Sequence, residues 1–252
     1  MSSMRTCAGS ACRLDAARPA SIAVAAVLAA VCAWAAGASA QSDALLPAVD
    51  HLVYATPDLE AGVDRIERLL GVRASPGGQH PGGGTRNALV SLGAGAYLEI
   101  IGPDPAQPPP AQPRPFAIDE LKEPRLMAWA AKGTGLEQLA RDAARGGVTL
   151  GEVIAGSRRR ADGVLLTWRY TDPRTVVADG LVPFFIDWGS APHPAASAAR
   201  GASLVALRAE HPDPQRVQNA LRHVRIELAV GQGPGPALVA VVSSPRGRVE
   251  LR

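Results

Sequence analysis

The hydrophobic pattern of the chain begins with a strand, continues with a helix and then shows three further strands. Residues 49–55 read as the first strand, and a helix follows between Asp58, a suitable N-cap, and Gly71, a suitable C-cap. Four apolar residues recur at helical spacing between these caps: Val63, Ile66, Leu69 and Leu70. Three later strands, with a Gly/Pro-rich loop at 76–84 after the first of them, are predicted at residues 72–75, 87–92 and 96–101. The pattern predicts a βαβββ module over residues 47–105.

A proline-rich segment and then a second copy of the same pattern follow. Residues 105–115, PAQPPPAQPRP, hold too many prolines for a helix or a central strand, so a stiff surface connection is expected there. The second copy, residues 124–189, is expected to contain these elements in order: strand 125–131, helix 135–145, extended segment 148–156, strand 164–170 and strand 182–188. Aligning the two copies places Glu99 and Asp187 at matching positions. This repeat predicts an α+β fold in which paired βαβββ modules form one curved mixed sheet.

The C-terminal region carries a shorter version of the pattern. Within residues 201–252, a strand is expected at 203–209, a helix at 213–224, and two strands at 237–243 and 248–251. These elements predict a βαββ extension that packs on the same domain.

Residues 1–40 have the three parts of an export signal. Three arginines precede an apolar run at residues 21–37, and the small residues Ala38-Ser39-Ala40 form a cleavage site before Gln41. The pattern predicts an exported protein, periplasmic or secreted. An uncleaved membrane anchor is the alternative, and a lipoprotein signal at Cys32 fits poorly because apolar residues continue past it. All three cysteines precede Gln41, so the cleaved protein would have no disulfide, thiolate nucleophile or Cys-ligated metal.

Composition and charge narrow the classes of function. Aromatic residues make up only 4% of the chain, so the core must consist mostly of Ala, Val, Leu and Ile. Removal of residues 1–40, which hold Arg5, Arg13 and Arg18 against Asp15, lowers the net charge from +3 to +1. No basic face emerges, which argues against nucleic-acid binding. The only basic cluster, residues 158–160, is interpreted as a solvated strand end or turn rather than a phosphate site.

Several motifs in order resemble a known superfamily. The motifs are Asp50–Ala55 (DHLVYA), Pro57–Leu59, His80–Leu89 (HPGGGTRNAL), Tyr97–Glu99 and Phe184–Gly189 (FFIDWG) with Pro192–Pro194. This series resembles the vicinal-oxygen-chelate superfamily, which includes glyoxalase I, extradiol dioxygenases and bleomycin-resistance proteins, and is most similar to bacterial glyoxalase-like domain proteins. The resemblance covers roughly residues 47–195. It implies that the two modules pair around a cupped pocket.

The resemblance also implies a metal site. Metal-dependent members place a ligand on the first strand and a carboxylate on the fourth strand of each module. His51 and Glu99 match these positions in the first module and would bind a divalent metal such as Mn, Fe, Ni or Zn. In the second module Asp187 lies at or next to the carboxylate position, but Ala128 stands opposite His51, so the set is incomplete. Alternatively, Glu99 is a polar residue hydrogen-bonded inside the cup.

Other residues are candidates for catalysis and ligand binding. His80, within the glycine-rich loop, is an acid–base candidate at the pocket mouth or else caps a turn. Asp187 is a second proton-transfer candidate or else a turn cap. Asn87 could hydrogen-bond a ligand or the His80 loop, and Trp188 could wall the pocket or pack at the edge of the core. His193, between two prolines, is interpreted as a loop residue.

Two classes of function remain open. One is a metal-assisted lyase, isomerase or dioxygenase that acts on a small molecule, and the other is a non-catalytic small-molecule-binding or sequestering protein. The incomplete second-module ligand set favours the binder, while the pair His51 and Glu99 favours the enzyme. A serine hydrolase of the α/β type is disfavoured because the chain has no G-x-S-x-G elbow. The paired modules complete the cup within one chain, so either a monomer or a homodimer is compatible with it, and membrane contact is expected only through an uncleaved N-terminal segment.

Overall fold

The computed structural model describes residues 45–93, 95–160 and 162–252. The predicted export signal at residues 1–40, with its alternatives as a membrane anchor or lipoprotein signal, lies outside the described residues. No helix within the described part of the chain is long and apolar enough to cross a membrane.

The first module forms in the predicted order. A short 3-10 turn, Leu46–Ala48, precedes these elements: β1 Val49–Ala55, α2 Leu59–Leu70, β2 Ser75–His80, β3 Thr85–Ser91 and β4 Tyr97–Pro103. Asp58 caps α2 by accepting a hydrogen bond from the backbone N–H of Ala61, and Gly71 ends it in the left-handed conformation at φ 69°. The predicted loop at residues 76–84 is wrong over its first half, because residues 76–80 pair with β3 as part of β2.

The second module repeats this order after the proline-rich connection. Its elements are β5 Arg125–Lys132, α3 Leu136–Arg145, β6 Val153–Arg159, β7 Leu165–Thr171 and β8 Phe184–Asp187. Three 3-10 turns lie outside these strands and helices: η2 Pro115–Glu120, η3 Ala178–Gly180 and η4 Pro194–Ala196. The short η2 turn begins at the end of the proline-rich segment.

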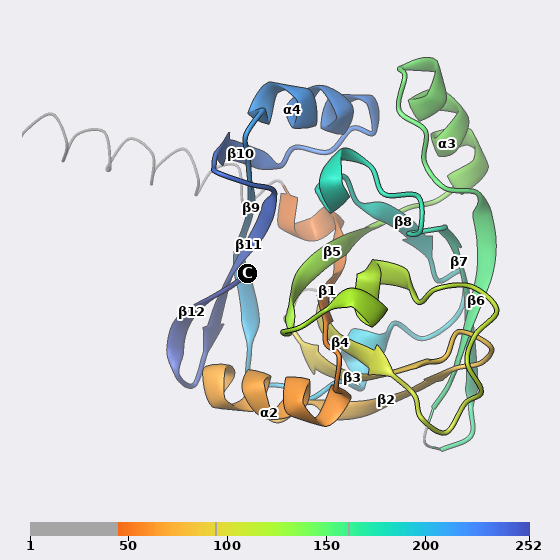
Figure 1. Ribbon diagram of the computed structural model, residues 1–252, viewed down its shortest axis with the longest axis vertical. Coiled ribbons are helices and arrows are strands. Elements are labelled where there is room, and N and C mark those ends of the chain that lie inside the picture. The colour runs from red at the N-terminus through yellow and green to blue at the C-terminus, as the bar shows by residue number, and fades with distance from the viewer. Residues whose placement is uncertain (1–44, 94, 161) are drawn as a thin grey trace, which may run out of the picture. The chain divides into compact units, whose positions relative to one another are not determined.

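The two modules close into one barrel, seen on the right of Figure 1. The strand order is β1-β4-β3-β2-β6-β7-β8-β5, and within each module the first and last strands run parallel. The modules meet through two antiparallel pairs, β1 with β5 and β2 with β6. The predicted α+β class with a curved mixed sheet is therefore confirmed, and the sheet curves far enough to close.

The strand β1 is buried on both faces and links the core to the barrel interior. Leu52 and Tyr54 pack in the main core beneath α2, while Val53 and Ala55 pack in a small cluster with Ile101. The main core is mostly aliphatic, as the scarcity of aromatic residues predicted. Side chains on alternate positions of a strand point to opposite faces, and from His51 onward the odd-numbered residues of β1 point into the barrel.

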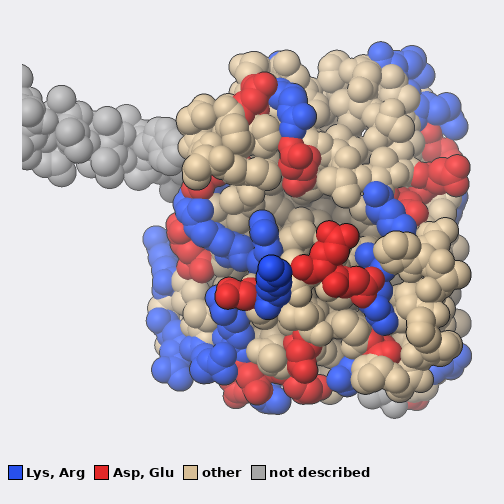
Figure 2. All heavy atoms as spheres, viewed as in Figure 1, with Lys and Arg blue, Asp and Glu red and all other residues tan. Residues whose placement is uncertain are grey.

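A second sheet follows the barrel. Its elements are β9 Ser203–His211, α4 Pro214–His223, β10 Ala229–Gln232, β11 Ala237–Ser244 and β12 Gly247–Leu251, and its strand order is β10-β9-β11-β12. The sequence pattern missed β10, because four residues that include Gly231 carry too little periodicity. Figure 1 shows this sheet beside the barrel, and the backbone N–H of Leu126 on β5 donates to the carbonyl of Arg252 over 2.9 Å. On the face seen in Figure 2, acidic and basic side chains are interspersed.

Candidate active site

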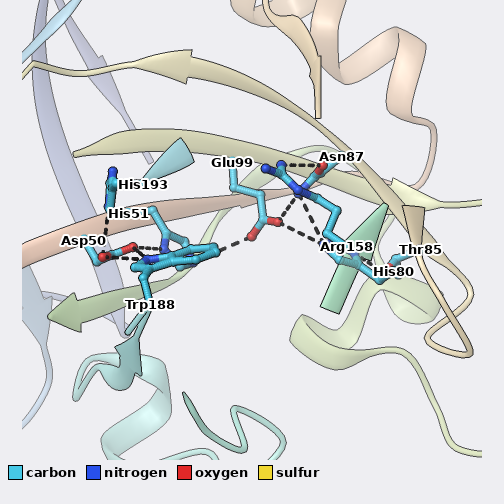
Figure 3. Close-up of polar contacts among 9 residues, drawn as sticks. All are labelled: Asp50, His51, His80, Thr85, Asn87, Glu99, Arg158, Trp188 and His193. Carbon is cyan, nitrogen blue, oxygen red and sulfur yellow. Dashed lines mark hydrogen bonds and ion pairs between the residues drawn. The ribbon is translucent and has the colours of Figure 1, made fainter. Parts of the chain in front are cut away.

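The barrel encloses a cavity of about 300 Å³. Its polar side chains come from strands that are far apart in the sequence, and they include four of the predicted candidates: His51 on β1, His80 at the end of β2, Asn87 on β3 and Glu99 on β4. A fifth candidate, Trp188, lines the same cavity directly after β8. Figure 3 shows these side chains together with the residues that hold them.

The buried carboxylate of Asp50 holds His51 from behind. Asp50 is 0% exposed, and its oxygens lie 2.7 Å from Nδ1 of His51, 3.1 Å from Nε2 of His193 and 3.1 Å from Nε1 of Trp188. Burial alone would raise the pKa of Asp50, but the hydrogen bonds from His193 and His51 outweigh it and hold the pKa well below its usual range. An ionised carboxylate only accepts hydrogen bonds, so Nδ1 of His51 carries the proton.

The other ring nitrogen of His51 is therefore available in the cavity. When the imidazole is neutral, Nε2 carries a lone pair, and it lies 3.8 Å from Oε2 of Glu99. The ring stacks on Tyr97 with centroids 4.6 Å apart. Burial raises the pKa of Tyr97 well above its usual value, with Asp50 and Glu99 adding to the effect, so the phenol stays protonated. A base and a neutral hydroxyl donor thus share one wall.

A second hydrogen-bonded chain joins Glu99, Asn87 and Arg158. The Asn87 amide donates from Nδ2 to Oε1 of Glu99 over 2.6 Å, and its Oδ1 accepts from Nη1 of Arg158 over 3.2 Å (Figure 3). Arginine only donates and an ionised carboxylate only accepts, which fixes the orientation of the amide between them. Asn87 therefore holds a carboxylate and a guanidinium apart while it contacts both.

His80 lies beside this chain in a neutral form. Its Nδ1 is 2.9 Å from Oγ1 of Thr85, and its Nε2 is 3.4 Å from Nδ2 of Asn87 and 3.8 Å from Oε1 of Glu99. Burial lowers the pKa of His80, and Arg158 lowers it further against the opposing charge of Glu99. The residue was predicted on a loop at the pocket mouth, but it ends β2 and lines the cavity wall.

The structure does not bring Asp187 into this cavity. Along β8 the residues at alternate positions, Phe184, Ile186 and then Trp188, line the cavity, so Asp187 points away from it. The Asp187 carboxylate instead accepts a hydrogen bond from the backbone N–H of Gly189 over 2.9 Å. Its contact is that of the turn cap named as the alternative.

Sequence reasoning missed three residues that build the site. Asp50 was named only as part of the first motif. His193 was interpreted as a loop residue, although its Nε2 donates a hydrogen bond to the Asp50 carboxylate. Arg158 was interpreted as solvated, yet it is 3% exposed, while its neighbour Arg159 is exposed. The sequence signal that could have identified Arg158 is strand alternation within residues 158–160. Consecutive side chains of a strand point to opposite faces, so one of two neighbouring arginines on a barrel strand points inward.

The predicted metal ligands do not form a metal centre as they are arranged. Catalytic metal sites usually take three protein ligands. Nε2 of His51 lies 3.8 Å from Oε2 of Glu99, and Nε2 of His80 lies 3.8 Å from Oε1. Oε1 already accepts a hydrogen bond from Asn87. Among residues 45–252, leaving aside the two undescribed positions, no group of three or more His, Cys, Asp or Glu side chains is placed to hold a metal ion.

Comparison with known families agrees with the fold. A family model described as a glyoxalase-like domain matches residues 49–225, which include both modules and continue through β9 and α4. The chain belongs to the glyoxalase-like domain family. The resemblance to the vicinal-oxygen-chelate superfamily inferred from the sequence motifs is thereby confirmed. No curated protein matches the chain.

Solved structures resemble the chain at low sequence identity. A hypothetical protein from Staphylococcus aureus is 15% identical, with a TM-score of 0.53, and the match covers 80% of this chain and 83% of that one. Methylmalonyl-CoA epimerase from Mycobacterium tuberculosis is 17% identical, with a TM-score of 0.34 and coverage of 55% and 85%. A Streptomyces coelicolor methylmalonyl-CoA epimerase variant in complex with 2-nitronate-propionyl-CoA is 18% identical, with a TM-score of 0.36 and coverage of 55% and 95%. The likeness to the Staphylococcus aureus protein concerns the fold alone.

Proposed function

We propose that this glyoxalase-like protein is a proton-transfer enzyme of the isomerase or lyase kind, with His51 as its general base. The observation that carries the proposal is the pairing of Asp50 with Nδ1 of His51, which leaves Nε2 facing the cavity. An imidazole whose tautomer is fixed by a buried carboxylate is a suitable base near neutral pH, because the carboxylate also stabilises the imidazolium that forms.

The side chains on the cavity wall provide the base and the hydrogen-bond donors that this reaction needs. Nε2 of His51 takes a proton from a substrate carbon beside a carbonyl group, and the C–H electron pair moves onto the carbonyl oxygen as an enolate. The protonated phenol of Tyr97 and the guanidinium of Arg158 are donors on the same wall that stabilise this oxygen. Return of the proton to the other face or to a neighbouring carbon completes an isomerisation, and departure of a group from the next carbon completes an elimination.

Exchange of substrate hydrogen with solvent tests this proposal. Small carboxylates, esters and thioesters with a C–H beside a carbonyl would be incubated with the protein in D₂O, and loss of the C–H signal followed by proton NMR. We expect His51→Gln to slow the exchange by about 100-fold, the usual contribution of a general base. His223→Gln, on the exposed surface of α4, is the matched control and should exchange like the wild type.

The second candidate function is a non-catalytic binder that uses the same cavity. The aromatic walls favour it, since they provide contact area without chemistry. Ligands that bind in the cavity without any exchange in the wild type would establish this function and contradict the first.

The predicted export signal adds a proposal about where the protein acts. We infer that residues 1–40 are removed on export and that the mature chain begins at Gln41, in the periplasm or outside the cell. Terminal sequencing of the protein recovered from its native host would test this, and a chain retaining residues 21–37 would contradict it.

A further inference from the structure

Aromatic side chains are concentrated in the cavity. The chain has only ten Trp, Tyr and Phe residues, and six of them line the cavity: Tyr97, Phe116, Trp168, Tyr170, Phe184 and Trp188. The rings of Trp168 and Trp188 lie 5.0 Å apart, those of Trp168 and Tyr170 6.2 Å, and those of Tyr170 and Phe184 6.4 Å, so they form a continuous wall. Because the core elsewhere is mostly aliphatic, this wall points to a ligand with a flat apolar body.

The charge on the same wall is incompletely paired. Arg158 is 3% exposed, and within the described residues no carboxylate lies within 4.0 Å of its guanidinium. Its Nε is buried with no hydrogen-bond partner, and its one hydrogen-bond acceptor in the described chain is Oδ1 of Asn87. A buried cation costs free energy unless it is paired, so this position is suited to an anion.

The strand β2, which neighbours β6 in the barrel, leaves space for the Arg158 guanidinium. A Cβ atom added to Gly77 would overlap Oδ1 of Asn87 and lie 2.7 Å from Nη1 of Arg158. The glycine therefore leaves the space that these two side chains occupy, and the β2 pairing with β3 is shifted in register between Pro76 and Gly78. The position of Arg158 is thus built into the fold.

We propose that the cavity binds an organic carboxylate with an aromatic or conjugated body, its carboxylate on Arg158 and its body against Trp168 and Trp188. The inference deepens the proposed function and rests on it for the location of the site. A carboxylate matches the planar guanidinium with two parallel hydrogen bonds and carries a single negative charge. A phosphate dianion would meet stronger repulsion from Glu99, which lies on the same wall.

Matched acids and amides test the inference without any variant. Benzoate, phenylacetate and cinnamate would be titrated into the protein by calorimetry, each beside its neutral amide, with cyclohexylacetate and phenyl phosphate as further arms. We expect each acid that binds to do so about 10- to 100-fold more tightly than its amide, as a charge-assisted hydrogen bond predicts. Cyclohexylacetate and phenyl phosphate should bind more weakly than phenylacetate. Acids that bind no better than their amides, or that do not bind at all, would overturn the inference.

Two variants assign the effect to Arg158. Arg158→Met should reduce the affinity for the acids to that for the amides, while Arg159→Met, exposed on the same strand, should leave both unchanged. Two outcomes separate this inference from the proposed function. Arg158-dependent binding of the acids without hydrogen exchange would remove the enzyme and keep the carboxylate site. Hydrogen exchange in the wild type, together with acids that bind no better than their amides, would remove the carboxylate site and keep the enzyme.

Discussion

Asp50 and His51 are neighbours in the sequence, and their side chains meet at 2.7 Å inside the barrel wall. Consecutive side chains of a regular strand point to opposite faces, so such a contact requires an irregularity. The pairing of β1 with β5 is shifted in register between Val49 and His51, and shifts of this kind re-aim side chains. The contact that orients the proposed base is therefore produced by the local irregularity at the start of β1.

Substitution of Asp50 should cost stability in a pH-dependent way. Asp50→Asn removes the charge that His51, His193 and Trp188 surround, and we expect a loss of about 1–3 kcal/mol in the free energy of unfolding at neutral pH. The pKa of Asp50 lies below its usual value of 3.8 in the folded protein, so its stabilising contribution is present above about pH 4 and is lost as the pH falls further. Urea denaturation at a series of pH values should show the difference between wild type and variant shrinking toward about pH 2. A difference that is constant, or that grows in acid, would contradict this account of Asp50.

The Asn87 amide should be needed for both of its partners. Asn87→Leu leaves Oε1 of Glu99 and Nη1 of Arg158 without their hydrogen bonds, and we expect a loss of about 1–3 kcal/mol in the free energy of unfolding. Asn219→Leu, on the exposed face of α4, is the control and should stay within about 0.5 kcal/mol of the wild type. Equal effects of the two substitutions would show that the Asn87 bridge does not stabilise the protein.

A methyl group at Gly77 should disturb the site through packing alone. Gly77→Ala forces Asn87 and Arg158 to move, at an expected cost of about 1–3 kcal/mol in stability. Gly235→Ala is the matched control, because nothing lies within 4 Å of a Cβ added there. Thermal denaturation of both variants checks the prediction. The prediction fails if Gly77→Ala unfolds at the same temperature as the wild type.

Metal binding at the predicted ligands should be weak. Oε1 of Glu99 is occupied by Asn87, and the two histidines face different oxygens, so a cation would have to rearrange all three contacts. After equilibration with Mn, Fe, Ni or Zn, elemental analysis should find well below one ion per chain. One ion per chain, lost in both His51→Ala and Glu99→Ala, would restore the metal site inferred from the resemblance.

The elements that could be predicted from the sequence are those with local signals. The helix α2 carries its own cap residues, Asp58 and Gly71, and an amphipathic face, so its position depends on nothing distant. The glycines of β2 were interpreted as a loop because local rules associate glycine with turns. Gly77 leaves room for Asn87 and Arg158 from other strands, and Gly78 lets the backbone of Arg159 approach closely, which no local pattern shows.

The candidate site could be predicted only in part for the same reason. Four polar residues and Trp188 were found because the repeat and the family motifs mark them, and the barrel brings all five together. Arg158 and His193 were not found, since their burial depends on how the strands close and on where the loop after β8 returns. Residues that act by holding others leave a weaker sequence signal than the residues they hold.

The tautomer of His51 is the measurement that tests the account most directly. Nitrogen-15 NMR of the imidazole rings, with the His51 signals assigned from His51→Gln, distinguishes a protonated Nδ1 from a protonated Nε2. We predict that neutral His51 carries its proton on Nδ1 in the wild type and loses this preference in Asp50→Asn, because the buried carboxylate can only accept. A proton on Nε2 in the wild type would leave no lone pair facing the cavity, and His51 could not be the base.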